Sequence, residues 1–259
     1  MDSVLALPWW GIAWVGAVVL AAGFAHGAIG FGFPILATPL LTLVLDLKTA
    51  ILVTLTSTIV LTLTSTLSGG GLRDSIARFW FMPIVLMGAT YFGTLILIGM
   101  DPAPLVLVLA VMLLVYLNVD RLKMLNFQVV RNHPRIWGVV AAFVAGLFEA
   151  TANMSGPVLL IYFLAMTAPP TRLVQLLNFS FVGGKITQLI AWSVSGGIGL
   201  AYWVSTLPLM VLAVAMWLIG MRVRSRVEAA TYMNWLRKFM WVMVGLLLAQ
   251  YARYLLVRA

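Results

Sequence analysis

The chain has 259 residues, of which 63% are hydrophobic and 9% are charged, and its mean hydropathy is +1.08. Soluble globular domains carry roughly a quarter charged residues, so this composition excludes a water-soluble fold and predicts an all-α membrane protein. The net charge of +9 lies in a few short loops, which is typical of membrane topology and argues against nucleic acid as a partner.

Hydropathy predicts ten apolar segments in chain order. They are 9–27, 33–46, 48–69, 77–98, 102–119, 136–152, 157–168, 171–195, 200–221 and 235–256. The first follows "MDSVLALPWW", which lacks the basic cluster of a signal peptide, so we interpret it as the first membrane helix. Segments 33–46 and 157–168 are too short to cross a hydrocarbon core of about 30 Å. Because each follows a Gly/Ser/Asn-rich break, we expect each to be a broken helix of a hairpin or a re-entrant loop near the bilayer midplane.

The segments form two groups of five. A basic linker, 121–135, separates a predicted first repeat, 1–120, from a second repeat, 136–259. A shift of 123 residues aligns several positions in the same order, namely Gly23 with Gly146, His26 with Glu149, Pro34 with Pro157, Ser57 with Ser180 and Trp80 with Trp203. Since five is an odd number, the sequence predicts two repeats of inverted topology.

Positive charge in the short loops predicts the orientation. The residues concerned are Arg73, Arg78, Arg121, Lys123, Arg131, Arg135, Arg222, Arg224 and Arg226. All fall on one side of the predicted bundle, which the positive-inside rule assigns to the cytoplasm. We therefore expect a multi-pass protein of the cell (inner) membrane with loop 120–135 cytoplasmic and the N-terminus periplasmic or external. Arg253 and Arg258, on the predicted outer side, count against this model.

The two breaks predict a binding site. Unpaired backbone groups at membrane depth are tolerated only where they are buried in protein or line a wet cavity. Pro34 and Pro157 each suit the first turn of a half-helix, whose free amides and positive dipole end attract an anion. Our candidate substrate-binding residues at the breaks are Gly27, Gly30, Phe31, Gly32, Asn153, Ser155 and Gly156. The alternative for the glycines is that they only permit close helix packing.

The same stretches carry a family resemblance. "GFAHGAIGFGFPILATPLL" resembles the glycine-rich repeat of the sulfite exporter TauE/SafE family, and "GLFEATANMSGPVLLIYFL" resembles its second copy. The resemblance implies a membrane transporter associated with export of sulfite or small organosulfur anions, and it leaves the substrate open. In the second copy Asn153 stands where Gly30 stands in the first, so we expect Asn153 to contact the ligand through its side chain.

Polar residues of the segment 171–195 form one helical face. They are Thr171, Gln175, Asn178, Lys185 and Gln188, spaced by 4, 3, 7 and 3 residues. Lys185 lies roughly 16 Å from the nearer end at 1.5 Å per residue, too far for its stem to reach the interface. Its ammonium must therefore meet a partner, water or an anion. We consider both a substrate contact, shared with Asn178 and Gln188, and a structural ion pair with Glu149.

Two further groups of polar residues face the predicted pocket. Ser57, Thr58 and Thr62 would form a polar wall opposite Lys185, unless these hydroxyls only bond carbonyls of their own helix. His26 and Glu149 occupy equivalent places before the two breaks. They are candidates for proton coupling, for substrate binding or for a structural pair.

Together these features predict a secondary transporter that exports a small, sulfur-containing anion such as sulfite or a sulfonate by alternating access. An anion channel and a proton-coupled symporter of small carboxylates are the alternatives. An enzyme is disfavoured because "GxSxG" and HExxH are absent. No cysteine and only two histidines are present, so we expect no metal and no cofactor. The expected partners are the small anion, the lipid bilayer and, if transport is coupled, protons; the oligomeric state is not predicted.

Overall fold

The computed structural model describes residues 4, 6–68, 72–101, 103–118, 127–168, 170–223 and 229–258. The predicted linker positions Arg121 and Lys123, the loop residues Arg224 and Arg226, and the side chain of Thr171 lie outside this description. The helices are α2 (Trp9–Ile29), α3 (Phe33–Leu41), α4 (Leu47–Ser68), α5 (Leu72–Phe79), α6 (Phe81–Gly99), α7 (Ala103–Leu117), α9 (Gln128–Asn132), α10 (Pro134–Ala152), α11 (Gly156–Ala165), α12 (Pro170–Val194), α13 (Leu200–Val223) and α14 (Ala229–Arg258).

The all-α prediction is confirmed, and each predicted apolar segment corresponds to a helix. Among the described residues, α2, α4, α6, α10 and α13 are long and apolar enough to cross a membrane. Two boundaries differ from the prediction. The predicted segment 77–98 is divided at Trp80, because the amphipathic α5 forms a separate short helix before α6. The predicted linker 121–135 overlaps α9 and the start of α10, where Pro134 occupies the first turn.

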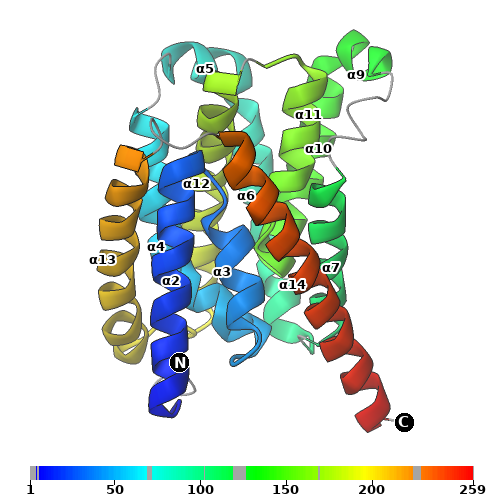
Figure 1. Ribbon diagram of the computed structural model, residues 1–259. Coiled ribbons are helices and arrows are strands. Elements are labelled where there is room, and N and C mark those ends of the chain that lie inside the picture. Colours follow the sequence, from blue (N-terminus) through cyan, green and yellow to red (C-terminus); the bar gives the residue numbers. More distant parts are fainter. Residues whose placement is uncertain are drawn as a thin grey trace.

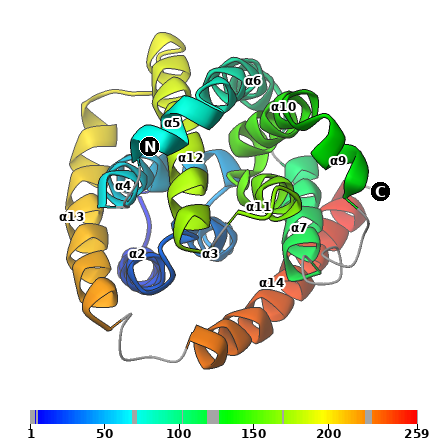
Figure 2. The same ribbon diagram turned by 90° about the horizontal axis from the view of Figure 1, so that it is seen from above.

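The helices pack in a reciprocal pattern across the two halves of the chain. Helix α2 packs against α13, and α10 packs against α6. The first predicted segment of each half thus meets the fourth predicted segment of the other. Helix α4 packs against α12, and α7 packs against α14. Seen from above, α3, α11 and α12 lie toward the middle, with α13 and α14 on the outside (Figure 2). This reciprocity supports two repeats related by a pseudo-two-fold axis.

Two hairpins end inside the bundle. Helix α3 has nine residues and α11 has ten, so neither spans a bilayer. Helix α3 returns toward the end where both termini lie, whereas α11 returns toward the end that carries α5 and α9 (Figure 1). The two hairpins thus enter the bundle from opposite ends, as inverted repeats require.

Glycines allow the helices to cross closely at the two equivalent interfaces. A Cβ at Gly23 would lie 2.7 Å from the carbonyl oxygen of Ala213 in α13. A Cβ at Gly146, 123 residues later, would lie 2.6 Å from the carbonyl oxygen of Leu86 in α6. In a membrane, where lipid is as apolar as leucine, such close backbone packing is a main source of helix association.

Substitution of Gly27 tests this close packing of α2 against α13. A Cβ there would overlap the carbonyl oxygen of Trp217 and lie 2.9 Å from the amide nitrogen of Met221, both in α13. We expect Gly27→Ala to destabilise the protein by about 1–3 kcal/mol, because backbone atoms of α13 would have to move. Thermal unfolding in detergent micelles measures the effect.

Gly16→Ala on the same helix is the matched control, because nothing lies within 4 Å of its added Cβ. Both substitutions gain the same helix propensity, so their difference isolates the steric term. Equal melting temperatures for the two variants would show that α2 and α13 do not cross as described.

Candidate functional site

The first break lies between α2 and α3 and depends on two left-handed glycines. Gly30 has φ 99° and ends α2, with its N–H donating to the carbonyl of His26 at 2.6 Å. Gly32 has φ 105° and precedes α3. Only glycine adopts such angles without strain, so these residues turn the chain where Pro34 then starts the half-helix.

The second break repeats the turn of Gly30, but not that of Gly32, 123 residues later, because Ser155 has φ −74°. Asn153 has φ 58° and ends α10, with its N–H donating to the carbonyl of Glu149 at 3.2 Å. Asparagine is among the few residues besides glycine that adopt the left-handed region readily. The break therefore keeps the backbone turn of Gly30 and adds an amide side chain to the site.

His26 closes the start of α3. Its Nδ1 accepts the N–H of Phe33 at 3.4 Å, and its Nε2 lies 3.1 Å from Ser65 Oγ on α4. Because Nδ1 accepts a hydrogen bond, the proton of the neutral ring belongs on Nε2, which then donates to Ser65. His26 is 1% exposed, so a neutral imidazole rests against the positive end of α3.

Glu149 closes the start of α11 in the equivalent place, but with a carboxylate. Its Oε2 accepts the N–H of Ser155 at 3.1 Å and also the Ser155 hydroxyl. A negative charge is favourable there because the amides and dipole of a helix N-terminus are positive. The start of α11 was predicted to attract an anion. In this structure the carboxylate of Glu149 lies there.

Lys185 of α12 is fully buried and has a counter-ion. Its Nζ lies 2.6 Å from Glu149 Oε1, donates to Gln188 Oε1 at 3.0 Å and donates to Asn153 Oδ1. A carboxylate and two amide oxygens thus surround the ammonium. The structure therefore shows the ion pair with Glu149 that the sequence offered as one of two readings.

Cross-repeat contacts bring the two breaks together. Asn153 Nδ2 donates to Thr38 Oγ1 of α3 at 2.7 Å and to Thr54 Oγ1 of α4 at 2.9 Å. Asn178 Nδ2 donates to the carbonyl of Gly30 at 2.7 Å. Asn178 and Lys185 lie seven residues apart on α12, about 10 Å along the axis, so one helix face connects both breaks. Thr38 was not predicted, although it lies one turn after Pro34 and so on the same face of α3.

Asn178 Oδ1 is an open acceptor in this region. Its oxygen is buried and has no hydrogen-bond partner among the described residues. Buried polar atoms are nearly always satisfied, so this oxygen marks a place where water or a ligand hydroxyl would bind. Gly156, the first residue of α11, packs against Ile35 of α3, since an added Cβ would lie 3.3 Å from Ile35 Cδ1.

The remaining predicted residues have other surroundings in the bundle. Gly27 contacts α13, which is the packing alternative, and Phe31 is buried at 8% exposure. Thr58 and Thr62 donate to the carbonyls of Thr54 and Thr58 at 2.7 Å, as hydroxyls in membrane helices often do. Ser57 Oγ is buried with no partner among the described residues.

His26 and Glu149 bond to different partners. His26 bonds to Ser65 within the first half of the chain, and Glu149 bonds to Lys185 within the second. Among the described residues, no group of three His, Asp or Glu side chains gathers that could hold a metal ion.

Comparison with known proteins identifies one family. A model described as sulfite exporter TauE/SafE matches residues 15–251. No curated protein and no solved structure matches the chain.

A double-mutant cycle tests the buried pair. Glu149→Gln or Lys185→Met alone leaves a buried charge without its counter-ion and is expected to cost about 3–5 kcal/mol. The double variant removes both charges, so the coupling energy should reach about 2 kcal/mol or more. Unfolding in detergent measures all four proteins. Additive effects of the two substitutions would mean that the ion pair does not exist in the folded protein.

Proposed function

The chain belongs to the sulfite exporter TauE/SafE family of membrane transporters, and on this premise we propose that it exports a small sulfur oxyanion, a sulfite or a sulfonate, by alternating access. The observation that carries this proposal is the meeting of two broken helices on one polar face of α12. Broken helices at membrane depth are how many secondary transporters expose backbone dipoles to a substrate.

Burial of the site favours a carrier over a channel. Glu149, Asn153, Asn178, Lys185 and Gln188 are each at most 2% exposed. Access to them from either side requires helices to move, as in an occluded state of a carrier. A channel would need a continuous open path past the same residues.

In this proposal the substrate binds at the α3 end of the site. In the first turn of α3 the amide of Phe33 donates to His26 and that of Leu36 donates to the carbonyl of Gly32, so the positive dipole end of the helix is what would attract an anion there. The residue that closes this end, His26, accepts its hydrogen bond as a neutral ring. At the α11 end the equivalent position already carries the Glu149 carboxylate. An anion is therefore attracted to α3 and to Gly30–Gly32, with Asn178 beside it, and is repelled by Glu149.

Glu149 then acts as a competitor inside the site. To reach Lys185 or the amide of Ser155, a substrate oxyanion must take over hydrogen bonds that the carboxylate now makes. Such an exchange gives the substrate a way to loosen α10 and the start of α11 from α12, because Glu149 of α10 bonds to both Ser155 and Lys185. This couples binding to the helix movement that alternating access requires.

Membrane voltage suffices as the driving force for a monoanion. Moving one negative charge out of a negative cytoplasm gains about 2.3 kcal/mol per 100 mV. A second candidate is electroneutral proton–anion symport, including symport of small carboxylates, and it is favoured by the carboxylate of Glu149 within the site. The two differ in whether flux carries net charge.

Substitution of Asn178 tests the position of the anion. Asn178→Asp and Asn178→Leu both remove the donor to the Gly30 carbonyl, but only the aspartate adds negative charge at the α3 end. In liposomes, we expect the half-saturating sulfite concentration of Asn178→Asp to exceed that of Asn178→Leu at least tenfold, about 1.4 kcal/mol. The same value in both variants would place the anion elsewhere.

Flux at a set voltage distinguishes the two driving modes. Liposomes with a potassium-clamped potential are loaded with sulfite, a sulfonate, thiosulfate, sulfate or a carboxylate, and efflux is followed with and without a pH gradient. We expect saturable sulfite or sulfonate efflux that accelerates when the inside is negative. Voltage-independent efflux that follows the pH gradient would instead establish symport, and unsaturable flux without counter-transport would establish a channel.

A further inference from the structure

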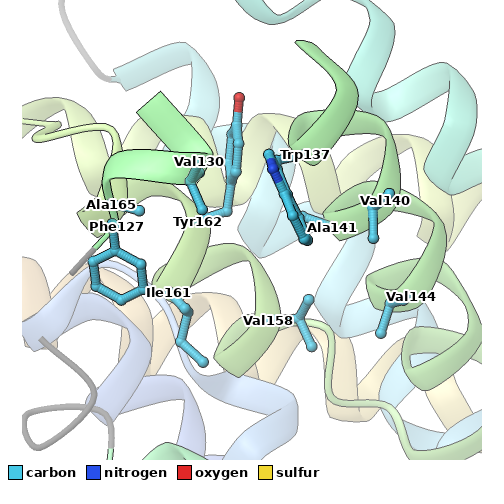
Figure 3. A pocket seen from close by; sticks show the side chains of 10 residues that line it. All are labelled: Phe127, Val130, Trp137, Val140, Ala141, Val144, Val158, Ile161, Tyr162 and Ala165. Carbon is cyan, nitrogen blue, oxygen red and sulfur yellow. The ribbon is translucent and has the colours of Figure 1, made fainter. Parts of the chain in front are cut away.

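A cavity away from the residues of the polar site lies beside the α10–α11 hairpin. This groove between α9, α10 and α11 has a volume of about 270 Å³ and is lined by apolar side chains, among them Val140, Val144, Val158 and Ile161 (Figure 3). Its size is close to the lower end of ligand pockets, about 300 Å³. Because its walls offer almost no polar atoms, its occupant must be a hydrocarbon.

One end of the groove has the character of a membrane interface. Trp137 and Tyr162 stand beside each other there (Figure 3), and the Tyr162 hydroxyl donates to the carbonyl of Pro134 at 2.9 Å. Tryptophan and tyrosine concentrate at the level of lipid headgroups. From Trp137 to Val144 the groove then follows α10 inward for about 10 Å at 1.5 Å per residue.

The same end is strongly basic. Arg131 and Arg135 are exposed; Arg131 directly follows the groove residue Val130, and Arg135 lies two positions before Trp137. Arg78 lies over the Phe79 ring, which packs edge-on against Phe163, the residue next to Tyr162 in the sequence.

The stretch of sequence around Arg131 and Arg135 carries no acidic residue. From position 121 to position 148 the sequence contains no aspartate or glutamate. An anion at this end of the groove would therefore meet arginines without a competing carboxylate from this stretch.

We propose that this groove binds one acyl chain of an anionic phospholipid, with the headgroup phosphate held by Arg131 and Arg135. The apolar walls fit a chain, the aromatic pair marks the headgroup level, and arginine pairs well with phosphate. The predicted cytoplasmic position of the basic end agrees with the leaflet where such basic pockets bind anionic lipids. The lipid site is separate from the transport site and does not depend on the transported substrate.

Native mass spectrometry of the delipidated protein tests the proposal. Palmitoyl-oleoyl phosphatidylglycerol is titrated against phosphatidylcholine with the same chains. We expect one phosphatidylglycerol to bind at least tenfold tighter than phosphatidylcholine. Arg131→Gln with Arg135→Gln should weaken this binding about 25-fold, since each basic residue near the headgroup contributes about fivefold. Arg222→Gln, at the end of α13, is the matched charge control and should leave the affinity unchanged.

A second variant tests the hydrocarbon part without changing charge. Ala141→Phe fills the groove, whereas Val211→Phe adds the same ring to an exposed, apolar position on α13. We expect only Ala141→Phe to weaken lipid binding, and glycerol 3-phosphate, which has no chain, to compete for it poorly. The proposal would be overturned if phosphatidylglycerol and phosphatidylcholine bound equally well. It would also be overturned if neither Ala141→Phe nor the double arginine variant weakened phosphatidylglycerol binding.

Discussion

Backbone groups at the two helix interruptions have to be hydrogen-bonded to the protein or to water in a cavity, because the surrounding lipid offers no partner. This constraint explains which residues surround the breaks. Asn178 satisfies the carbonyl of Gly30, His26 satisfies the amide of Phe33, and Glu149 satisfies the amide of Ser155. Polar side chains that look out of place in an apolar sequence are thus required by the breaks themselves.

The same constraint determines how the bundle is assembled. Each break can be satisfied only if other helices approach it closely, and α12 reaches both breaks from the middle of the molecule. The outer crossings of α2 with α13 and of α10 with α6 depend on Gly23 and Gly146, where backbones come together without side chains between them. Close packing of the outer helices holds the hairpins against α12, so the glycine crossings and the polar site stabilise each other.

Much of the fold could be predicted from the sequence because its signals are local. The apolar segments, the prolines that start α3 and α11, and the glycine that ends α2 act within a few residues, and the structure places helices accordingly. The division at Trp80 was missed because α5 and α6 join without a proline or glycine between them. Local patterns also identified Lys185 as a residue whose ammonium must meet a partner, water or an anion.

The partners themselves could not be chosen from the sequence. Lys185 and Glu149 lie 36 positions apart, and the spacing along α12 fits an ion pair and a substrate contact equally well. The contact between Asn153 and Thr38 joins the two halves of the chain, and the internal repeat does not reveal which helices meet across it. For hydroxyls such as Thr62, the choice between a neighbour and the helix carbonyl depends on packing, and in this structure the carbonyl accepts.

The differences between the two halves of the chain also bear on which hairpin moves under the proposed mechanism. If two inverted repeats were identical, exchanging their conformations would cost nothing, and the inward-open and outward-open states would have equal energy. Here α10 is held to α12 by the buried pair of Glu149 and Lys185, whereas α2 is held to α4 by the neutral contact of His26 and Ser65. Separating a buried ion pair costs several kcal/mol, and breaking a neutral hydrogen bond costs about 1 kcal/mol. Under the proposed mechanism, the α2–α3 hairpin therefore moves at lower cost, and α10–α11 follows only when an anion takes the place of the carboxylate.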